Sequence, residues 1–243
     1  MGAKIICEPE KRLIKISGVS SLVGAKTRVC PDRNEIVSLA TAALATSGEI
    51  ILKNVSAVLR FGGISQSVEY LKSFLEKIEE LGGEWKTVAD GLKFTGCAPF
   101  NSVFIETAPH PAFMTDWQQP FCVLLTQSRG ESIIHETVYE DRFGYIKDLQ
   151  KMGAKISISD ECPGGHACRF QGQTFNHSIK IEGPVKLRGI EIQMKDIRAG
   201  MAHVIAALTA EGESVISGIE HLDRGYEKID ERLKMLGAEI RRI

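Results

Sequence analysis

The stretch APHPAFMTDWQQPF, residues 108–121, places a single carboxylate, Asp116, among prolines and aromatic side chains. Pro109 and Pro111 restrict the backbone that leads to it. Phe113 and Trp117 surround it with apolar rings. A carboxylate held in this way suits a general base that accepts a proton from a substrate. We therefore predict Asp116 as the catalytic residue. An N-cap for the helix that follows is its alternative structural role, and the two roles are compatible.

Four arginines follow an aspartate at or near an expected helix start. The free N–H groups of a helix N-terminus carry partial positive charge, and a guanidinium adjacent to them completes a site for phosphate or carboxylate. A single Asp-Arg step is more simply a helix cap with a solvated neighbour. Its recurrence favours a shared anion site formed by Arg33, Arg142, Arg198 and Arg224.

The run ECPGGHACRFQGQTFNH contains residue types that bind zinc, at Cys162, His166, Cys168 and His177. Their spacing differs from that of the common C-x-x-C pairs, so we predict no metal site and interpret residues 161–177 as a partly exposed β-hairpin insertion. The remaining cysteines lie among apolar residues and are predicted to be buried, unreactive thiols: Cys7, Cys30, Cys97 and Cys122.

Composition restricts the class of protein. The 243 residues are 43% hydrophobic and 25% charged, which suits a folded globular chain. The formal net charge of -1 gives no electrostatic basis for binding nucleic acid or an anionic membrane. No apolar run is long enough to span a membrane, and the N-terminus lacks the apolar segment of a secretory signal. We expect a cytoplasmic protein with mostly reduced thiols.

Three sequence repeats must position these residues. Gly48, Gly130 and Gly212 lie 82 positions apart, and each begins a Gly-Glu step before a β-branched strand. An apolar helix is predicted before each glycine, in PDRNEIVSLATAAL, TDWQQPFCVLL and KDIRAGMAHVIAAL, with Asp32, Asp116 and Asp196 as N-caps. Glu35 is spaced to complete a capping box with Asp32. A second, amphipathic helix and a short closing strand follow each glycine.

The repeating unit is thus β-β-α-β-α-β. Its first helix is apolar nearly all round, as buried helices are. The predicted fold class is α/β (α+β): a single-domain inside-out α/β barrel, residues 1–243, with pseudo-threefold symmetry. Its repeats would cover about 12–89, 91–160 and 178–243, with the insertion at 161–177. An ordinary α+β sandwich is the alternative. Lys4–Glu8 would be an edge strand or the last strand of a preceding repeat.

Four motifs in this order closely resemble the C-terminal half of the UDP-N-acetylglucosamine 1-carboxyvinyltransferases, the nucleotide-sugar branch of the enolpyruvyl transferase family. They are APHPAFMTDWQQPF, ETVYEDRFGYIKDLQKMGA, MKDIRAGMAHVIAALTAEG and HLDRGYEKIDERLKMLGAEIRRI. The resemblance extends back through VCPDRNE and covers essentially the whole chain. It implies two such barrels with the active site between them, and only one barrel in this chain.

The resemblance implies transfer of enolpyruvate from phosphoenolpyruvate to the 3'-hydroxyl of UDP-N-acetylglucosamine, the first committed step of peptidoglycan synthesis, without a cofactor or metal. It gives Asp116 the role of base, places Thr115 and Val138 on the sugar and uridine side, and puts the four arginines at the cleft, with Arg198 and Arg224 serving phosphoenolpyruvate. The missing N-terminal barrel would supply a Lys-Asn pair and a Cys loop. Without it we expect the chain to be inactive.

Two other functions stay open. A transferase acting on 3-phosphoshikimate would share the architecture, although the Pro-His-Pro and Asp-Arg-Gly-Tyr-Glu motifs resemble the nucleotide-sugar branch. A non-catalytic barrel that binds a ligand or a partner chain is the other alternative.

Overall fold

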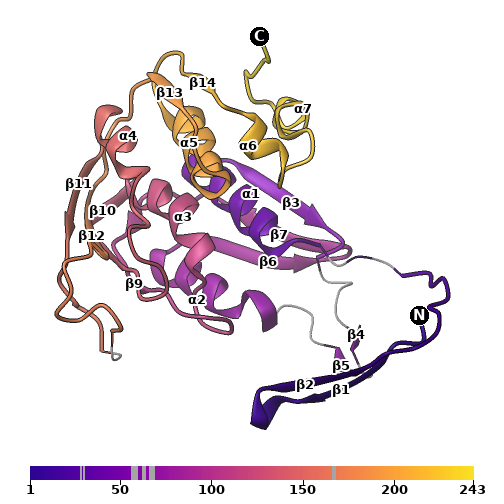
Figure 1. Ribbon diagram of the computed structural model, residues 1–243. Helices are drawn as coiled ribbons and strands as arrows, with labels where there is room; N and C mark the ends of the chain where they lie inside the picture. Colours follow the sequence, from indigo (N-terminus) through magenta and orange to yellow (C-terminus); the bar gives the residue numbers. More distant parts are fainter. Residues whose placement is uncertain (28, 30, 56–59, 62–63, 66–68, 166–167) are drawn as a thin grey trace. The chain divides into compact units, whose positions relative to one another are not determined.

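The computed structural model describes the chain except residues 28, 30, 56–59, 62–63, 66–68 and 166–167 (Figure 1). It divides into two compact units, Met1–Cys30 and Pro31–Ile243. The sequence predicts one domain from 1 to 243; that assignment and the limits of its three repeats stay predictions. Within the described residues, none of the helices is long and apolar enough to cross a membrane.

The first unit is a β-hairpin. Strand β1 (Lys4–Glu8) pairs antiparallel with β2 (Leu13–Ser17) across the short helix η1 (Pro9–Lys11). Apolar side chains of both strands are exposed, and so is Cys7. The prediction that Cys7 is buried is therefore wrong, because neither face of this hairpin is covered within its own unit.

Three apolar helices form the centre of the second unit. They are α1 (Arg33–Ala45), α3 (Gln118–Leu125) and α5 (Ile197–Thr209), and each contacts the other two (Figure 1). Every residue of α3 is buried, including Gln118, whose Oε1 accepts a 2.8 Å hydrogen bond from Tyr145. The all-round apolar pattern predicted this burial correctly.

Sheets surround these helices. The first has the order β3 (Glu49–Lys53), β7 (Gly91–Thr95), β6 (Glu84–Val88) and is antiparallel. The second joins β11 (Lys155–Ser159), β12 (Ser178–Gly183) and β10 (Ser128–His135), with short parallel partners β8 (Phe100–Asn101) and β9 (Phe104–Glu106) beside β10. The third pairs β13 (Glu191–Gln193) with β14 (Val215–Ser217) in parallel. A separate pairing links β4 (Arg60–Phe61) and β5 (Ile64–Ser65).

The outer helices follow the predicted positions less closely. Helix α2 (Lys72–Leu81), preceded by η2 (Glu69–Leu71), ends at Gly82 in the left-handed conformation. Helix α4 (Ile146–Lys151) is short. The third predicted outer helix is divided into α6 (Glu220–Asp223) and α7 (Ile229–Met235), with Lys228 at φ 47° between them.

The end of the third repeat also departs from the prediction. Residues 237–243, all of them described, form no strand, so the expected third closing strand is wrong. Here Arg242 instead binds Asp223 and Asp230 at 2.6 and 3.0 Å, holding the tail against α6 and α7 by side-chain contacts.

The predicted N-caps have different outcomes. Asp32 caps α1 by accepting a 2.8 Å bond from the N–H of Asn34. The carbonyl of Asp196 accepts from the N–H of Gly200 at 3.0 Å, at the start of α5. Asp116 is not a cap: it lies inside the 3-10 turn η3 (Thr115–Trp117), whose N-cap is Met114. The structure therefore directs the Asp116 side chain to other partners.

A core of helices enclosed by sheets and outer helices is the inside-out α/β arrangement predicted from the repeats. The sandwich alternative is wrong, because the three central helices pack on one another rather than on one side of a sheet.

Candidate active site

Asp116 forms an ion pair with Arg142. Its Oδ1 accepts a hydrogen bond from Nη2 of Arg142 at 2.5 Å, and the two side chains are 24% and 10% exposed. The Arg142 guanidinium also lies over the ring of Tyr139, 4.7 Å from its centroid. A charge-assisted bond of this kind fixes a carboxylate in one orientation. The carboxylate keeps enough exposure to be reached from solvent.

Glu136 connects two other predicted site residues. One of its carboxylate oxygens, Oε2, accepts from the hydroxyl of Thr115 at 2.8 Å. The other, Oε1, accepts from the N–H groups of Val138 at 2.8 Å and Tyr139 at 3.0 Å. Glu136 itself is fully buried. Its negative charge therefore holds η3 and the loop after β10 in a fixed relation.

The first repeat reaches this site through Trp117. The indole N–H of Trp117 donates to Oδ1 of Asn34 at 3.0 Å, which links η3 to the first turn of α1. Trp117 is completely buried and packs edge-on against Phe113 and Phe74. Arg33, the first residue of α1, is half-buried next to Asn34. The aromatic residues flanking Asp116 thus anchor it to the core.

The third repeat contacts this region through Tyr226. The Tyr226 hydroxyl lies 2.8 Å from Oγ of Ser38 on α1. Burial raises the pKa of Tyr226 to about 12, with the hydrogen bond to Ser38 opposing this and the negative charges of Asp32, Glu35 and Asp116 adding to it. Carboxylates from two repeats therefore act on one hydroxyl, so the starts of α1 and η3 and the segment after α6 belong to one region.

Gly225 brings the same segment close to α5. A Cβ built on Gly225 would meet Cδ1 of Ile197, the first residue of α5, at 2.8 Å. This turn therefore passes close to the start of α5, and a side chain at position 225 would displace the end of the Ile197 side chain. Arg224 immediately precedes it and is exposed. Arg198 is the second residue of α5, and its side chain lies outside the described part of the chain.

The predicted residues fall into two groups. Asp116 forms a hydrogen bond with Arg142, and Thr115, its neighbour in the sequence, shares the acceptor Glu136 with Val138. Arg33, Arg198 and Arg224 lie on the helix starts and turn that border this group, and their roles in binding stay predictions. Sequence reasoning missed Glu136, Asn34 and Tyr226; only their positions within the quoted motifs gave a signal.

A hollow in the surface lies away from these residues. A shallow cavity of about 380 Å³ is lined by residues that include Ala45, Phe100 and Arg129, near the C-terminal end of α1. None of the predicted site residues lines it. We assign the candidate site from the hydrogen-bonded residues around Asp116, because those residues connect the predicted catalytic carboxylate to its partners.

An inside-out α/β barrel with a paired aspartate and arginine at the edge of its core has the architecture of an enolpyruvyl transferase domain. The family model for EPSP synthase (3-phosphoshikimate 1-carboxyvinyltransferase) matches residues 1–233. The chain belongs to this family of enolpyruvyl transferases.

Within the family, the chain is similar to proteins of the nucleotide-sugar branch. The chain is 41% identical over 241 residues to a UDP-N-acetylglucosamine 1-carboxyvinyltransferase of Protochlamydia amoebophila (strain UWE25), covering 99% of this chain and 49% of that protein. It is 38% identical over 231 residues to the protein of that name from Chlamydia abortus (strain DSM 27085 / S26/3), covering 94% of this chain and 50% of the relative. The chain therefore spans about half the length of the curated relatives it matches.

Solved structures agree on the fold. The enolpyruvyl transferase NikO from Streptomyces tendae superposes with a TM-score of 0.72 at 23% identity, covering 88% of this chain and 44% of the other. EPSP synthase from Acinetobacter baumannii gives a TM-score of 0.56 at 17% identity, covering 90% and 46%. At these identities the likeness supports the architecture alone.

Proposed function

We propose that this chain forms one half of a UDP-N-acetylglucosamine 1-carboxyvinyltransferase, with Asp116 as the base. The observation that carries this proposal is the Asp116–Arg142 pair at the edge of the barrel core, in a chain 41% identical to a relative of that name. The pair provides an oriented carboxylate, and the relatives favour the nucleotide-sugar acceptor over 3-phosphoshikimate.

In the proposed reaction, the 3'-hydroxyl oxygen of the sugar bonds to C2 of phosphoenolpyruvate while its proton passes to Asp116. The methylene carbon of phosphoenolpyruvate gains a proton at the same stage, giving a tetrahedral intermediate. Loss of a proton from that carbon and departure of phosphate then restore the double bond. Asp116 accepts the hydroxyl proton, and Arg142 keeps the carboxylate aimed. This chemistry moves protons and phosphate and requires no metal ion.

We assign the anionic groups of both substrates to three of the predicted arginines. Arg33 and Arg198 belong to the first turns of α1 and α5, and Arg224 follows α6. Guanidinium groups are suited to binding phosphate and carboxylate. Thr115 and Val138, held by the buried Glu136, are assigned to the sugar and uridine side. These assignments come from the family resemblance and are supported by the links to Asp116.

A second barrel is part of the proposal, because the chain spans half the length of its relatives. We propose that this partner, in the same or another chain, closes over the substrates and supplies the acid that protonates the methylene carbon. Closure excludes water and brings the opposing groups within bonding distance. The reaction would take place in the cytoplasm.

The test mixes the chain with the complementary half of a relative and measures phosphate release with both substrates present. The isolated chain is expected to be inactive, and the mixture active. Asp116→Asn removes the proton acceptor at nearly constant size and should lower the rate by about 10²–10⁴-fold. Asp90→Asn, at an exposed aspartate near Lys53, is the matched control and should retain the rate.

Three outcomes would overturn the proposal. Turnover by the isolated chain would remove the need for a second barrel. Full activity of Asp116→Asn would exclude Asp116 as the base. Phosphate release with shikimate 3-phosphate, and none with UDP-N-acetylglucosamine, would assign the chain to the other branch.

Binding by the isolated chain gives a second measurement. With part of the anion site absent, phosphoenolpyruvate should bind in the millimolar range or not measurably, because each missing charge-assisted bond removes about 1.5–3 kcal/mol. A titration followed by NMR tests this. Micromolar binding that is unaffected by the double change Arg198→Ala and Arg224→Ala would contradict their assignment.

A further inference from the structure

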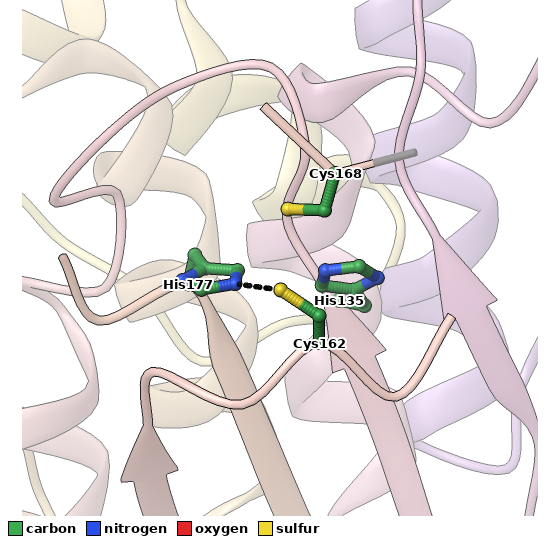
Figure 2. Close-up of side chains that lie close together, drawn as sticks. All are labelled: His135, Cys162, Cys168 and His177. Atoms are coloured by element: carbon green, nitrogen blue, oxygen red, sulfur yellow. Dashed lines mark hydrogen bonds between the residues drawn. The ribbon is translucent and has the colours of Figure 1, made fainter. Parts of the chain in front are cut away.

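Four zinc-ligand side chains converge beside the second sheet. His135, Cys162, Cys168 and His177 each offer one ligand atom, and these atoms all lie within 4.8 Å of one another. Figure 2 shows the four side chains facing a common centre. His135, Cys168 and His177 are buried and Cys162 is half-buried. Residues that are distant in sequence, from β10 and from the insertion, thus form one compact cluster.

The sheet register explains the convergence. His135, the last residue of β10, pairs with Ser178 of β12 on one side and with Glu106 of β9 on the other. His177 directly precedes β12, and Cys162 lies just beyond the end of β11. Three of the ligands therefore come from the same edge of one sheet, and the insertion returns Cys168 to it. His166 lies outside the described residues.

His135 is oriented as a metal ligand. Its Nδ1 lies 2.9 Å from Oε2 of Glu106, so the carboxylate holds the proton on Nδ1 and leaves a lone pair on Nε2. That Nε2 is buried and makes no hydrogen bond within the described part of the chain. A buried polar atom without a partner carries a free-energy cost. A carboxylate behind a histidine is also the usual support of a zinc ligand.

His177 has a matching arrangement. Its Nδ1 lies 2.7 Å from the carbonyl oxygen of Phe175, to which it donates. Its Nε2 therefore carries the lone pair and lies 3.1 Å from Sγ of Cys162, as the dashed line in Figure 2 shows. Both histidines thus have Nδ1 engaged by an oxygen and Nε2 directed into the cluster.

The loop is fitted closely around this centre. A Cβ built on Gly164 would fall 1.4 Å from Oε2 of Glu106 and 2.6 Å from Nδ1 of His135. Only glycine lets the backbone pass so near the Glu106–His135 pair. Beyond it, Sγ of Cys168 accepts a hydrogen bond from the N–H of Phe170 at 3.4 Å. Such a bond stabilises negative charge on the sulfur, as a thiolate ligand requires.

We propose that His135, Cys162, Cys168 and His177 bind one structural zinc ion through two imidazole Nε2 atoms and two thiolates. Zinc bonds of about 2.0–2.3 Å in a tetrahedron place ligand atoms about 3.3–3.8 Å apart, close to the spacing of the cluster. Four protein ligands close the coordination sphere, so the ion has a structural role. This inference reverses the expectation of no metal, which rested on sequence spacing and did not include His135.

The zinc would fix the insertion against the loop that carries Val138. Arg169, next to Cys168, donates from Nη1 to the carbonyl oxygen of Val138 at 3.0 Å and lies 3.6 Å from Glu140. Glu136, next to His135, donates its N–H to the carbonyl oxygen of His177 at 2.7 Å. The metal site and the candidate active site therefore share a backbone, although zinc binding does not depend on the proposed reaction.

Metal analysis of the purified chain tests the site. We expect about one zinc per chain after desalting without chelators. Cobalt added to the metal-free protein should give thiolate-to-cobalt absorption in the near ultraviolet and the intense visible bands of tetrahedral coordination. Cys162→Ser and Cys168→Ser should each lose both signals. Cys97→Ser, at a half-buried cysteine bonded to the carbonyl of Thr95, is the matched control and should retain them.

The cobalt spectrum of the unmodified chain keeps the test decisive even if the cysteine variants fail to fold. An octahedral spectrum without sulfur bands, or zinc content that stays far below one per chain after zinc is added, would overturn the proposal. So would mass spectrometry that finds a Cys162–Cys168 disulfide in protein prepared without oxygen. Unchanged metal content in folded Cys162→Ser and Cys168→Ser proteins would have the same meaning.

Discussion

Two neighbouring residues at the end of β10, Glu136 and His135, are both buried and polar, but they differ in how far hydrogen bonds satisfy them. Glu136 accepts three hydrogen bonds, from Thr115, Val138 and Tyr139. His135, one position earlier, is bonded to Glu106 through Nδ1, while its buried Nε2 has no hydrogen bond within the described residues. Both side chains are fully buried. They differ in whether the folded chain itself satisfies them.

This difference separates a positioning residue from a ligand. A buried charge with several donors is stabilised by the protein, so Glu136 needs nothing from outside and serves to hold the loop beside Asp116. The buried Nε2 of His135 has no hydrogen-bond partner within the described residues, and a metal ion at the centre of the cluster would bind its lone pair. The comparison predicts that removing Glu136 harms the folded chain directly, whereas the role of His135 depends on zinc.

The largest effect on stability is expected at Glu136. Glu136→Leu leaves the hydroxyl of Thr115 and two backbone N–H groups without their acceptor, and should lower the free energy of unfolding by about 3 kcal/mol. Glu136→Gln keeps an acceptor oxygen and should cost about 1 kcal/mol. Urea unfolding measures both. Glu131→Leu, at an exposed glutamate of the same strand, is the control and should change stability by less than about 0.5 kcal/mol.

Equal losses for Glu136→Leu and Glu131→Leu would contradict the comparison. The comparison would also be contradicted if added zinc restored the stability of Glu136→Leu and of no other variant. The side chain of Glu136 bonds to Thr115, Val138 and Tyr139, so its loss should not depend on zinc.

Glu106 offers the next test, on the His135 side. Glu106→Gln keeps the shape of the side chain and weakens the acceptor for Nδ1 of His135. Loss of such a support lowers metal affinity by about 10–100-fold. Competition with a chelator of known zinc affinity would measure the change. Glu182→Gln on β12 is an exposed control and should leave the affinity unchanged. Loss of stability without any change in zinc affinity would mean that Glu106 only fills space.

A smaller effect is expected where the first and third repeats meet. Tyr226→Phe removes a hydroxyl bonded to Ser38, and should lower the free energy of unfolding by about 1 kcal/mol. The double change Tyr226→Phe with Ser38→Ala should cost less than the two single changes added together, because each single change leaves the other hydroxyl alone. Additive losses in urea unfolding would show that the two hydroxyls do not interact.

The sequence predicted the core of the fold because repetition and helix periodicity are local signals. Three all-apolar helices after aspartates could only be buried, and α1, α3 and α5 are. The same patterns did not reveal the break between α6 and α7, since Gly225 passes close to Ile197, a contact made by distant residues. The prediction of a third closing strand was wrong for a related reason, because a strand forms only where a neighbouring strand pairs with it.

The candidate site was predicted in part. Asp116 was identified by its apolar neighbours, and the structure pairs it with Arg142, another predicted residue. Glu136 could not be identified, because its burial depends on how η3 meets the loop after β10. The Cys-His cluster was missed for the same physical reason: His135 lies 27 positions before Cys162 in the sequence, and only the sheet register brings them together.

His203 on α5 is a third buried polar group to set beside Glu136 and His135, and it lies close to a negatively charged carboxylate. Its side chain is 4% exposed, and its Nε2 lies 3.4 Å from Oδ2 of Asp148. Burial lowers the pKa of His203 from its ordinary 6.5, and the charges of Asp148 and Asp196 partly oppose this. Because these effects work against each other, we expect the smallest effect here.

The pH dependence has a definite sign. With a lowered pKa in the folded state, the unfolded chain binds the proton more readily as the pH falls below about 6.5, so the free energy of unfolding should decrease in that range. His203→Gln should flatten this slope, and Asp148→Asn should steepen it by removing a charge that favours protonation. Urea unfolding at several pH values between 7.5 and 5.5 would measure the slopes, with His110→Gln, at an exposed histidine, as the control. A slope that His203→Gln leaves unchanged would show that other groups govern acid sensitivity, and that His203 keeps its proton affinity through Asp148.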